Sequence, residues 1–171
     1  MKNYRLYQVD SFTKNLFQGN PAGGRCPIYF VSTAPPNVLV GIRERTTLNG
    51  LKPNLEKLTE ISRQIRCNGY FVFVLTDAFG GVLSPGRMFA PAIGIPEDPV
   101  TGNANGPLGA YLVQHRLVPN DGRRFAFEGQ QGEAIGRLGT VEVAVDIAEG
   151  RPRAVQVGGR AVTVFKSEIT L

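Results

Sequence analysis

The chain has 171 residues, of which 42% are hydrophobic and 19% charged, and its formal net charge is +5. This length and composition suit one or two small folded domains without a disulfide or metal staple, and they exclude intrinsic disorder. Gly occurs 21 times and Pro 12 times, which favours tight turns and many strands over long helices. The two cysteines, Cys26 and Cys67, have neither disulfide-framework nor zinc-ligand spacing, so we expect no metal.

The charge pattern gives little support for a polyanionic partner. The longest basic run is Arg123-Arg124, and no aromatic–basic motif of a nucleic-acid-binding module accompanies it. No apolar run has the length of a signal peptide or of a membrane-spanning helix. We therefore expect a cytoplasmic protein that binds neither nucleic acid nor membrane, and whose scattered arginines suit a small anionic ligand.

The first half of the chain predicts strands followed by one helix. Leu55, Leu58, Ile61 and Ile65 recur at the helical period, with Asn54 placed to cap the helix and Gly69 to end it. Tyr70–Thr76 is short and continuously apolar, which is typical of a buried strand. Earlier strands are expected over Tyr4–Asp10, Ile28–Ser32 and Val38–Arg43, the last two around a turn at residues 34–37.

The second half predicts a second helix between further strands. Leu108, Tyr111, Leu112 and His115 form one helical stripe. Strands are expected over Arg87–Ala90, Arg123–Glu128, Gly139–Ile147, Ala154–Val157 and Ala161–Lys166. Eight or nine strands with two helices indicate an α+β fold with a mixed or antiparallel sheet.

The densest cluster of functional residue types lies directly before the second helix, in the run EDPVTGNA. The first N–H groups of a helix have no internal acceptors and favour an anion, and Gly102 would let a ligand carboxylate approach the backbone closely. Asp98 would lie beside that carboxylate, in a position suited to moving a proton. The same pattern also fits a surface loop in which Asp98 and Asn103 only cap the helix.

Two other features have simpler interpretations. His115 is the only histidine and lies near the end of the second helix, where a structural role is favoured. The segments Gln130–Gly132 and Gly136-Arg137 could form turns that offer an arginine and backbone amides to an anion, or a plain hairpin.

Several runs, in order along the chain, resemble the phenazine-biosynthesis PhzF-type isomerase family: YRLYQVDSFT, GNPAG, APPNVLVGI, MFAPAIGIPEDPVTGNA, GQQGEAIGRLGTVEV and VQVGGRAV. The resemblance implies the diaminopimelate-epimerase fold, in which two similar lobes each have a curled sheet around a central helix. It implies a proton shift on a small carboxylate-bearing substrate, without metal or organic cofactor.

The resemblance also assigns roles to individual residues. Asp98 matches the aspartate of the family's second-lobe DPxTG motif and is the implied catalytic group. Thr101, Gly102, Asn103 and Ala104 match the loop that holds the substrate carboxylate, although many members carry Ser where this chain has Asn103. Asn20 matches the early GNP segment near the cleft.

Two motifs of the resembled family are absent from this sequence: the Ser-Glu-Thr segment with the catalytic glutamate, and the Cys-Gly-His-Ala-Thr motif of the first lobe. We therefore expect residues 1–27 to be the remnant opening strand of a first lobe. Residues 28–171 would form the second lobe, whose last strand could pack back on that remnant.

The resulting expectation is a PhzF-like isomerase or epimerase homologue with weak or no activity alone. One alternative is a non-catalytic binding or assembly module that self-associates, as a homodimer or larger assembly, through apolar surface exposed by the missing lobe. Another is a product of gene deletion without a selected function.

Overall fold

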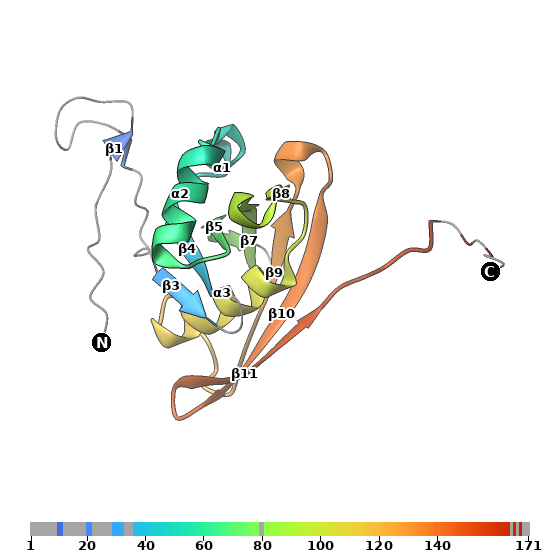
Figure 1. Ribbon diagram of the computed structural model, residues 1–171. Coiled ribbons are helices and arrows are strands. Elements are labelled where there is room, and N and C mark those ends of the chain that lie inside the picture. The colour runs from blue at the N-terminus through green and yellow to red at the C-terminus, as the bar shows by residue number, and fades with distance from the viewer. Residues whose placement is uncertain are drawn as a thin grey trace.

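A computed structural model of the chain describes residues 10–11, 20–21, 29–32, 36–78, 81–164, 166 and 168. Its main feature is one nine-stranded sheet (Figure 1). Seven strands form the path across this sheet, in the order β11 (Arg151–Gly158), β10 (Gly139–Ala148), β9 (Arg124–Gln131), β7 (Gly81–Ala90), β5 (Gly69–Val74), β4 (Pro36–Ile42) and β3 (Tyr29–Ser32). The short strands β6 (Thr76–Ala78) and β8 (Ile95–Asp98) both pair with β7.

The sheet is mixed, as expected from the sequence. The pairs β4–β5 and β7–β9 are parallel, and the other neighbouring pairs are antiparallel. Parallel neighbours need a crossover connection. Helices α1 (Arg45–Gly50) and α2 (Leu55–Ile65) lie in the first crossover, and α3 (Gly102–Gln114) lies in the second. Single 3-10 turns occur at Pro91–Ile93 and Glu133–Ile135.

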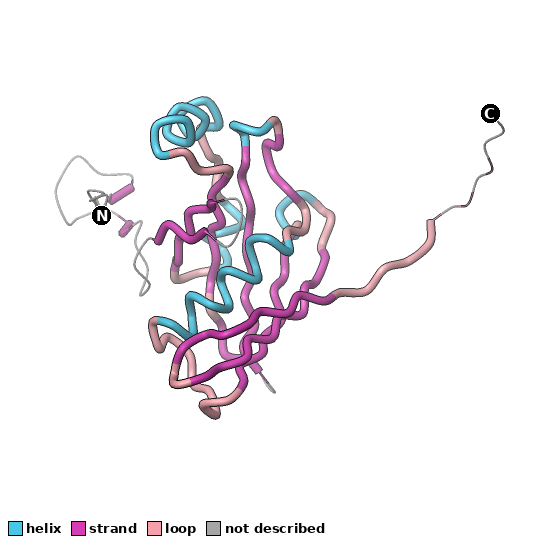
Figure 2. Tube along the Cα trace, turned by 60° about the horizontal axis from the view of Figure 1, so that its bottom comes forward, coloured by secondary structure: helices cyan, strands magenta, loops and turns pink. Residues whose placement is uncertain are grey.

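Helix α3 is the central element of the core. It runs across the sheet beside the β10–β11 hairpin (Figure 2), and its buried residues include Leu108 and Leu112. These leucines belong to one apolar cluster with side chains from β5, β9 and β10. Gly109 allows the close approach, because a Cβ atom there would lie 2.9 Å from Val145 Cγ2 and 3.0 Å from Val143 Cγ1. The α+β class with a curled sheet around a central helix is therefore confirmed.

Helix α2 agrees with the periodicity that predicted it. Asn54 is its N-cap, and the Asn54 side chain accepts a hydrogen bond from the Lys57 N–H. The expected end at Gly69 is wrong, because Arg66 ends the helix in the left-handed conformation with φ 57°. Gly69 instead begins β5, where a Cβ atom would lie 2.7 Å from the carbonyl oxygen of Phe89.

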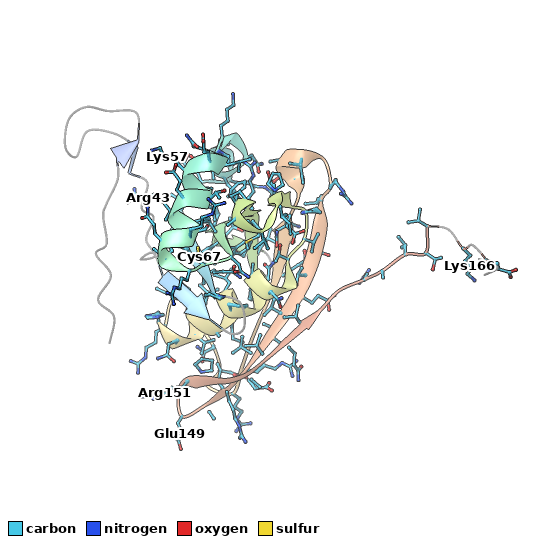
Figure 3. All side chains as sticks on the ribbon, in the orientation of Figure 1. Arg43, Lys57, Cys67, Glu149, Arg151 and Lys166 are labelled. Carbon is cyan, nitrogen blue, oxygen red and sulfur yellow. The ribbon has the colours of Figure 1, made fainter. Side chains whose placement is uncertain are left out.

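Helix α1 and the strands β6 and β8 are additional to the two helices and the strands that the sequence predicts, and other differences lie at turns and at the C-terminal segment. Pro36 and Asn37 belong to β4 rather than to the preceding turn. No strand forms over the described residues of Ala161–Lys166: Val162 and Val164 are exposed, and Lys166 lies on an extended segment beyond the sheet (Figure 3). Most of the expected strand Tyr4–Asp10, and Cys26, lie outside the described residues.

Candidate functional site

The candidate site lies where β8 ends and α3 begins. Asp98 is the last residue of β8, Thr101 is the N-cap of α3, and Gly102 is the first helical residue. Asp98, Thr101 and Gly102 are each partly exposed, so their polar atoms can meet a ligand. The structure thus holds the carboxylate and the helix N-terminus within one short segment.

The Thr101 side chain binds Asp98 and does not cap its own helix. The Thr101 hydroxyl donates to Asp98 Oδ2 over 2.6 Å, and no side-chain cap hydrogen bond forms at this end of α3. Neither Asp98 nor Asn103 occupies the N-cap position. The capping interpretation of this loop is therefore wrong, and the partial positive charge of the helix N-terminus remains available.

The open backbone donors are fewer than the sequence predicted. The Ala104 N–H already donates to the Thr101 carbonyl over 3.2 Å, and the Ala104 side chain is fully buried. Among the described residues, the Gly102 and Asn103 N–H groups have no acceptor. A bound carboxylate would therefore meet these two amides.

Two buried amide side chains hold the Thr101 backbone, and we call Gln131 and Asn105 the amide clamp. Their exposed fractions are 1% and 0%. Gln131 Oε1 accepts from the Thr101 N–H over 3.0 Å and from Asn105 Nδ2 over 2.7 Å. Asn105 Nδ2 also donates to the Thr101 carbonyl over 3.0 Å. The clamp therefore satisfies both backbone polar groups of the residue that begins the helix.

Sequence reasoning missed the clamp. Of the two alternatives for Gln130–Gly132, the plain hairpin is the one that forms: Gln131 is the last residue of β9 and pairs with Gly139 of β10, while Gly132 begins the turn with φ 81°. Asn105 packs against Gly129 of the same strand, where a Cβ atom would lie in the place of Asn105 Oδ1. In the sequence, the signal for this contact is Gly129, two residues before Gln131, and this signal is weak.

A further polar contact joins the start of α3 to β4. Asn37 is buried, and its Nδ2 donates to the Asn103 carbonyl over 3.2 Å. Of the six predicted site residues, five therefore lie together at the start of α3. Asn20 lies in β2 (Asn20–Pro21), which among the described residues pairs with β1 (Asp10–Ser11) and not with a strand of the nine-stranded sheet.

Glu97, the neighbour of Asp98, belongs to a buried ion pair. Arg87 of β7 binds both Glu97 carboxylate oxygens over 2.8 Å. Arg87 Nη1 also donates to the carbonyls of Leu48, Asn49 and Leu51 at the end of α1. Since adjacent strand residues point to opposite faces, the ion pair fixes β8 while Asp98 points away from Arg87.

The remaining candidate residues have structural surroundings. His115 is the C-cap of α3, and its ring centroid lies 4.9 Å from that of Tyr111. Cys67, which follows α2 (Figure 3), is buried and donates to Ser62 Oγ over 3.6 Å.

In the described part of the chain, no group of three or more His, Cys, Asp or Glu side chains could hold a metal ion. No helix there is long and apolar enough to cross a membrane.

The curled mixed sheet and its central helix give the described part of the chain an epimerase-like α+β fold. The model of the family of phenazine biosynthesis-like proteins, PhzC-PhzF, matches residues 23–167. The chain belongs to this family.

The chain is 54% identical over 144 residues to an uncharacterized isomerase of Clostridium acetobutylicum, covering 84% of this chain and 48% of the relative. It is 32% identical over 139 residues to the trans-2,3-dihydro-3-hydroxyanthranilate isomerase of Pseudomonas aeruginosa, covering 80% of this chain and 45% of the enzyme. The crystal structure of a PhzF-family phenazine biosynthesis protein of Bacillus anthracis matches with a TM-score of 0.62 and 27% identity, over 77% of this chain and 44% of that one. The chain thus spans about half the length of the curated relatives it matches.

Proposed function

We propose that this chain supplies the carboxylate-binding half of a proton-shifting isomerase site. The observation that carries the proposal is the Asp98–Thr101 hydrogen bond of 2.6 Å beside the open Gly102 and Asn103 amides. The helix N-terminus would bind the substrate carboxylate, and Asp98 would transfer the proton. The related isomerase of Pseudomonas aeruginosa supports a small, cyclic, carboxylate-bearing substrate.

Isomerisation by this chain alone should be weak or absent. The sequence lacks the glutamate segment and the Cys-Gly-His-Ala-Thr motif that the resemblance would require for the other half of the site. Loss of one general acid–base group costs a factor of about 10² to 10⁴ in rate. We therefore expect the chain to bind a carboxylate ligand but not to turn the substrate over rapidly.

Binding is tested with a pair of ligands that differ by the carboxylate. The probe is 3-hydroxyanthranilate, and the control is 2-aminophenol, which lacks only the carboxylate. Calorimetry should detect binding of the first and at least about tenfold weaker binding of the second, a difference of about 1.4 kcal/mol. Equal affinity for both ligands, or no binding of either, would contradict a carboxylate site.

Gly102→Ala locates the binding to the start of α3. The new Cβ atom would meet Val157 Cγ1 at 3.4 Å, an ordinary contact, so the variant should fold. Because helical Cβ atoms tilt toward the N-terminus, the methyl group would crowd the bound carboxylate. Binding should weaken about tenfold or more, or about 1.4 kcal/mol. The matched control is Gly50→Ala, where a Cβ atom meets nothing within 4 Å.

Turnover is tested by following the dihydro-hydroxyanthranilate substrate in D₂O by NMR. The trans-2,3-dihydro-3-hydroxyanthranilate isomerase of Pseudomonas aeruginosa serves as the comparison enzyme. The chain should turn over at least about 10²-fold more slowly than an active relative, and Asp98→Asn should abolish the remainder. A rate that matches the relative and survives Asp98→Asn would refute the proposal.

A second candidate function is a non-catalytic assembly module. Its support is a set of exposed apolar side chains near the site, on β8, the β9–β10 loop and the segments beside them: Ile93, Ile95, Val100, Ile135 and Leu138. Such surface is typical of interfaces when it forms a contiguous patch. Sedimentation should then show a dimer or larger assembly that Leu138→Glu dissociates, and a monomer at all concentrations would exclude this function.

A further inference from the structure

The hydrogen bonds around Thr101 have only one consistent set of directions. A carbonyl oxygen can only accept and a backbone N–H can only donate. The Thr101 carbonyl therefore fixes Asn105 Nδ2 as the donor toward it, at 3.0 Å. The Thr101 N–H likewise requires Gln131 Oε1 as its acceptor, at 3.0 Å. Both clamp amides are thus fixed by partners that cannot reverse.

The orientation of Gln131 determines what its amide nitrogen does. With Oε1 toward the Thr101 N–H, Nε2 points to the Asp98 carbonyl at 3.2 Å and to Thr101 Oγ1 at 3.3 Å. The Asp98 carbonyl confirms this direction, because it accepts only. The Thr101 hydroxyl oxygen is therefore an acceptor from Gln131.

A hydroxyl group has a single proton to donate. Since Thr101 Oγ1 accepts from Gln131, that proton is directed to Asp98 Oδ2, 2.6 Å away. A proton on Asp98 Oδ2 would leave the hydroxyl proton without an acceptor among the described residues. Asp98 Oδ2 is thus held as an acceptor, which leaves Oδ1 as the carboxyl oxygen that can take up a proton.

We infer that Gln131 and Asn105 are positioning residues that act through Thr101, directing the Thr101 hydroxyl proton onto Asp98 Oδ2 and reserving Oδ1 for the substrate's proton. Asp98 then begins the reaction as the base. In that step the substrate C–H bond breaks, the proton moves to Oδ1, and the electron pair stays on the substrate. The role of Asp98 as the base rests on the proposed function, whereas the hydrogen-bond directions are independent of it.

Two acidic groups of the neighbouring elements, Glu97 and Glu133, are held in ion pairs. On β8 and β7, Glu97 binds Arg87 over 2.8 Å. Glu133, which follows β9, binds Arg45 of α1 over 2.8 Å. Among the described residues, the Thr101 hydroxyl is the group that donates a hydrogen bond to the Asp98 side chain. Replacing that hydroxyl is therefore a selective perturbation.

The test follows the chemical shift of the Asp98 carboxyl carbon by NMR at neutral pH in the full, unliganded chain. Thr101→Val keeps the shape of the side chain and removes the hydroxyl, whereas Thr101→Ser retains it. Because Thr101→Val removes the donor to Oδ2, the chemical shift should change in Thr101→Val and stay near the native value in Thr101→Ser. A chemical shift unchanged in the valine variant, or changed equally in both, would overturn the inference.

The role of Gln131 is tested by combination. Gln131→Met removes the donor that orients the hydroxyl, so the chemical shift of the Asp98 carboxyl carbon should change part of the way toward that of Thr101→Val. In the double variant the chemical shift should equal that of Thr101→Val, because Gln131 acts through Thr101. Additive changes would show that Gln131 acts independently and would overturn this part. Failure of the native chain to bind 3-hydroxyanthranilate would refute the proposed function and leave these spectra unaffected.

Discussion

The buried ion pair between Arg87 and Glu97 offers the largest effect on stability that the structure predicts. The two side chains are only 7% and 13% exposed, and two parallel hydrogen bonds of 2.8 Å join them. Arg87 Nη1 also donates to three carbonyls that end α1. Removing Arg87 would therefore leave a buried carboxylate and the end of a helix without their donors.

The magnitude follows from these lost partners. Breaking a buried pair from one side costs about 3–5 kcal/mol, because the remaining charge is uncompensated. Arg87→Met should fall in this range. Adding Glu97→Gln removes that charge, so the double variant should recover part of the loss. It should remain about 1–3 kcal/mol less stable than the native chain, since the α1 carbonyls still lack a donor.

The assay is urea unfolding monitored by circular dichroism, with Arg45→Met as the matched control. Arg45 and Glu133 form an exposed pair, with side chains 39% and 41% exposed, and such pairs contribute less than about 1 kcal/mol. If Arg87→Met costs no more than Arg45→Met, the buried pair does not hold β8 against α1. A double variant no more stable than Arg87→Met would also contradict the reasoning about the uncompensated charge.

Three further predictions concern stability. Gly109→Ala should destabilise the chain by about 1 kcal/mol in urea unfolding, although alanine has the better helix propensity. The reason is that the new Cβ atom would meet Val145 at 2.9 Å in a packed core. An increase in stability would contradict this packing. Asn54→Ala should cost about 1 kcal/mol by the same assay, because the Lys57 N–H loses its cap, and an unchanged midpoint would show that the cap does not contribute. Burial raises the pKa of Tyr70 from 10.0 to about 12, so the native state keeps a proton that the unfolded state loses. Unfolding free energy should therefore fall between pH 10 and 12, and Tyr70→Phe should fall less steeply there; identical pH profiles would refute this.

Elements with a regular apolar pattern were predictable because their burial is encoded locally. The period of Leu55 to Ile65 and the continuous apolar run before Thr76 correspond to α2 and β5. Helix α1 was not predictable, since RTTLNG contains β-branched residues, Asn and Gly, which are poor helix formers. The carbonyls at its end are bound by Arg87, far away in sequence, and this tertiary contact is invisible in a local pattern.

The site shows the same division between local and distant signals. Asp98, Thr101 and Gly102 are adjacent in sequence, and the turn before a helix was sufficient to connect them. Gln131 lies 30 residues from Thr101 and is joined to it only because β9 ends beside the start of α3. No spacing rule identifies such a residue, since its role depends on the sheet order and not on its neighbours in the chain.

The location of the amide clamp explains why binding and turnover should separate in this protein. Among the described residues, the side chains that hydrogen-bond to the Asp98–Thr101 pair come from β9 and α3, within the nine-stranded sheet and its central helix. The proposed carboxylate-binding half can therefore keep its geometry without the other half of the relatives' length. Proton transfer is different, because it needs a second group on the opposite side of the substrate and exclusion of water. A chain that binds 3-hydroxyanthranilate through its carboxylate but turns over the dihydro substrate slowly is what this structural independence predicts.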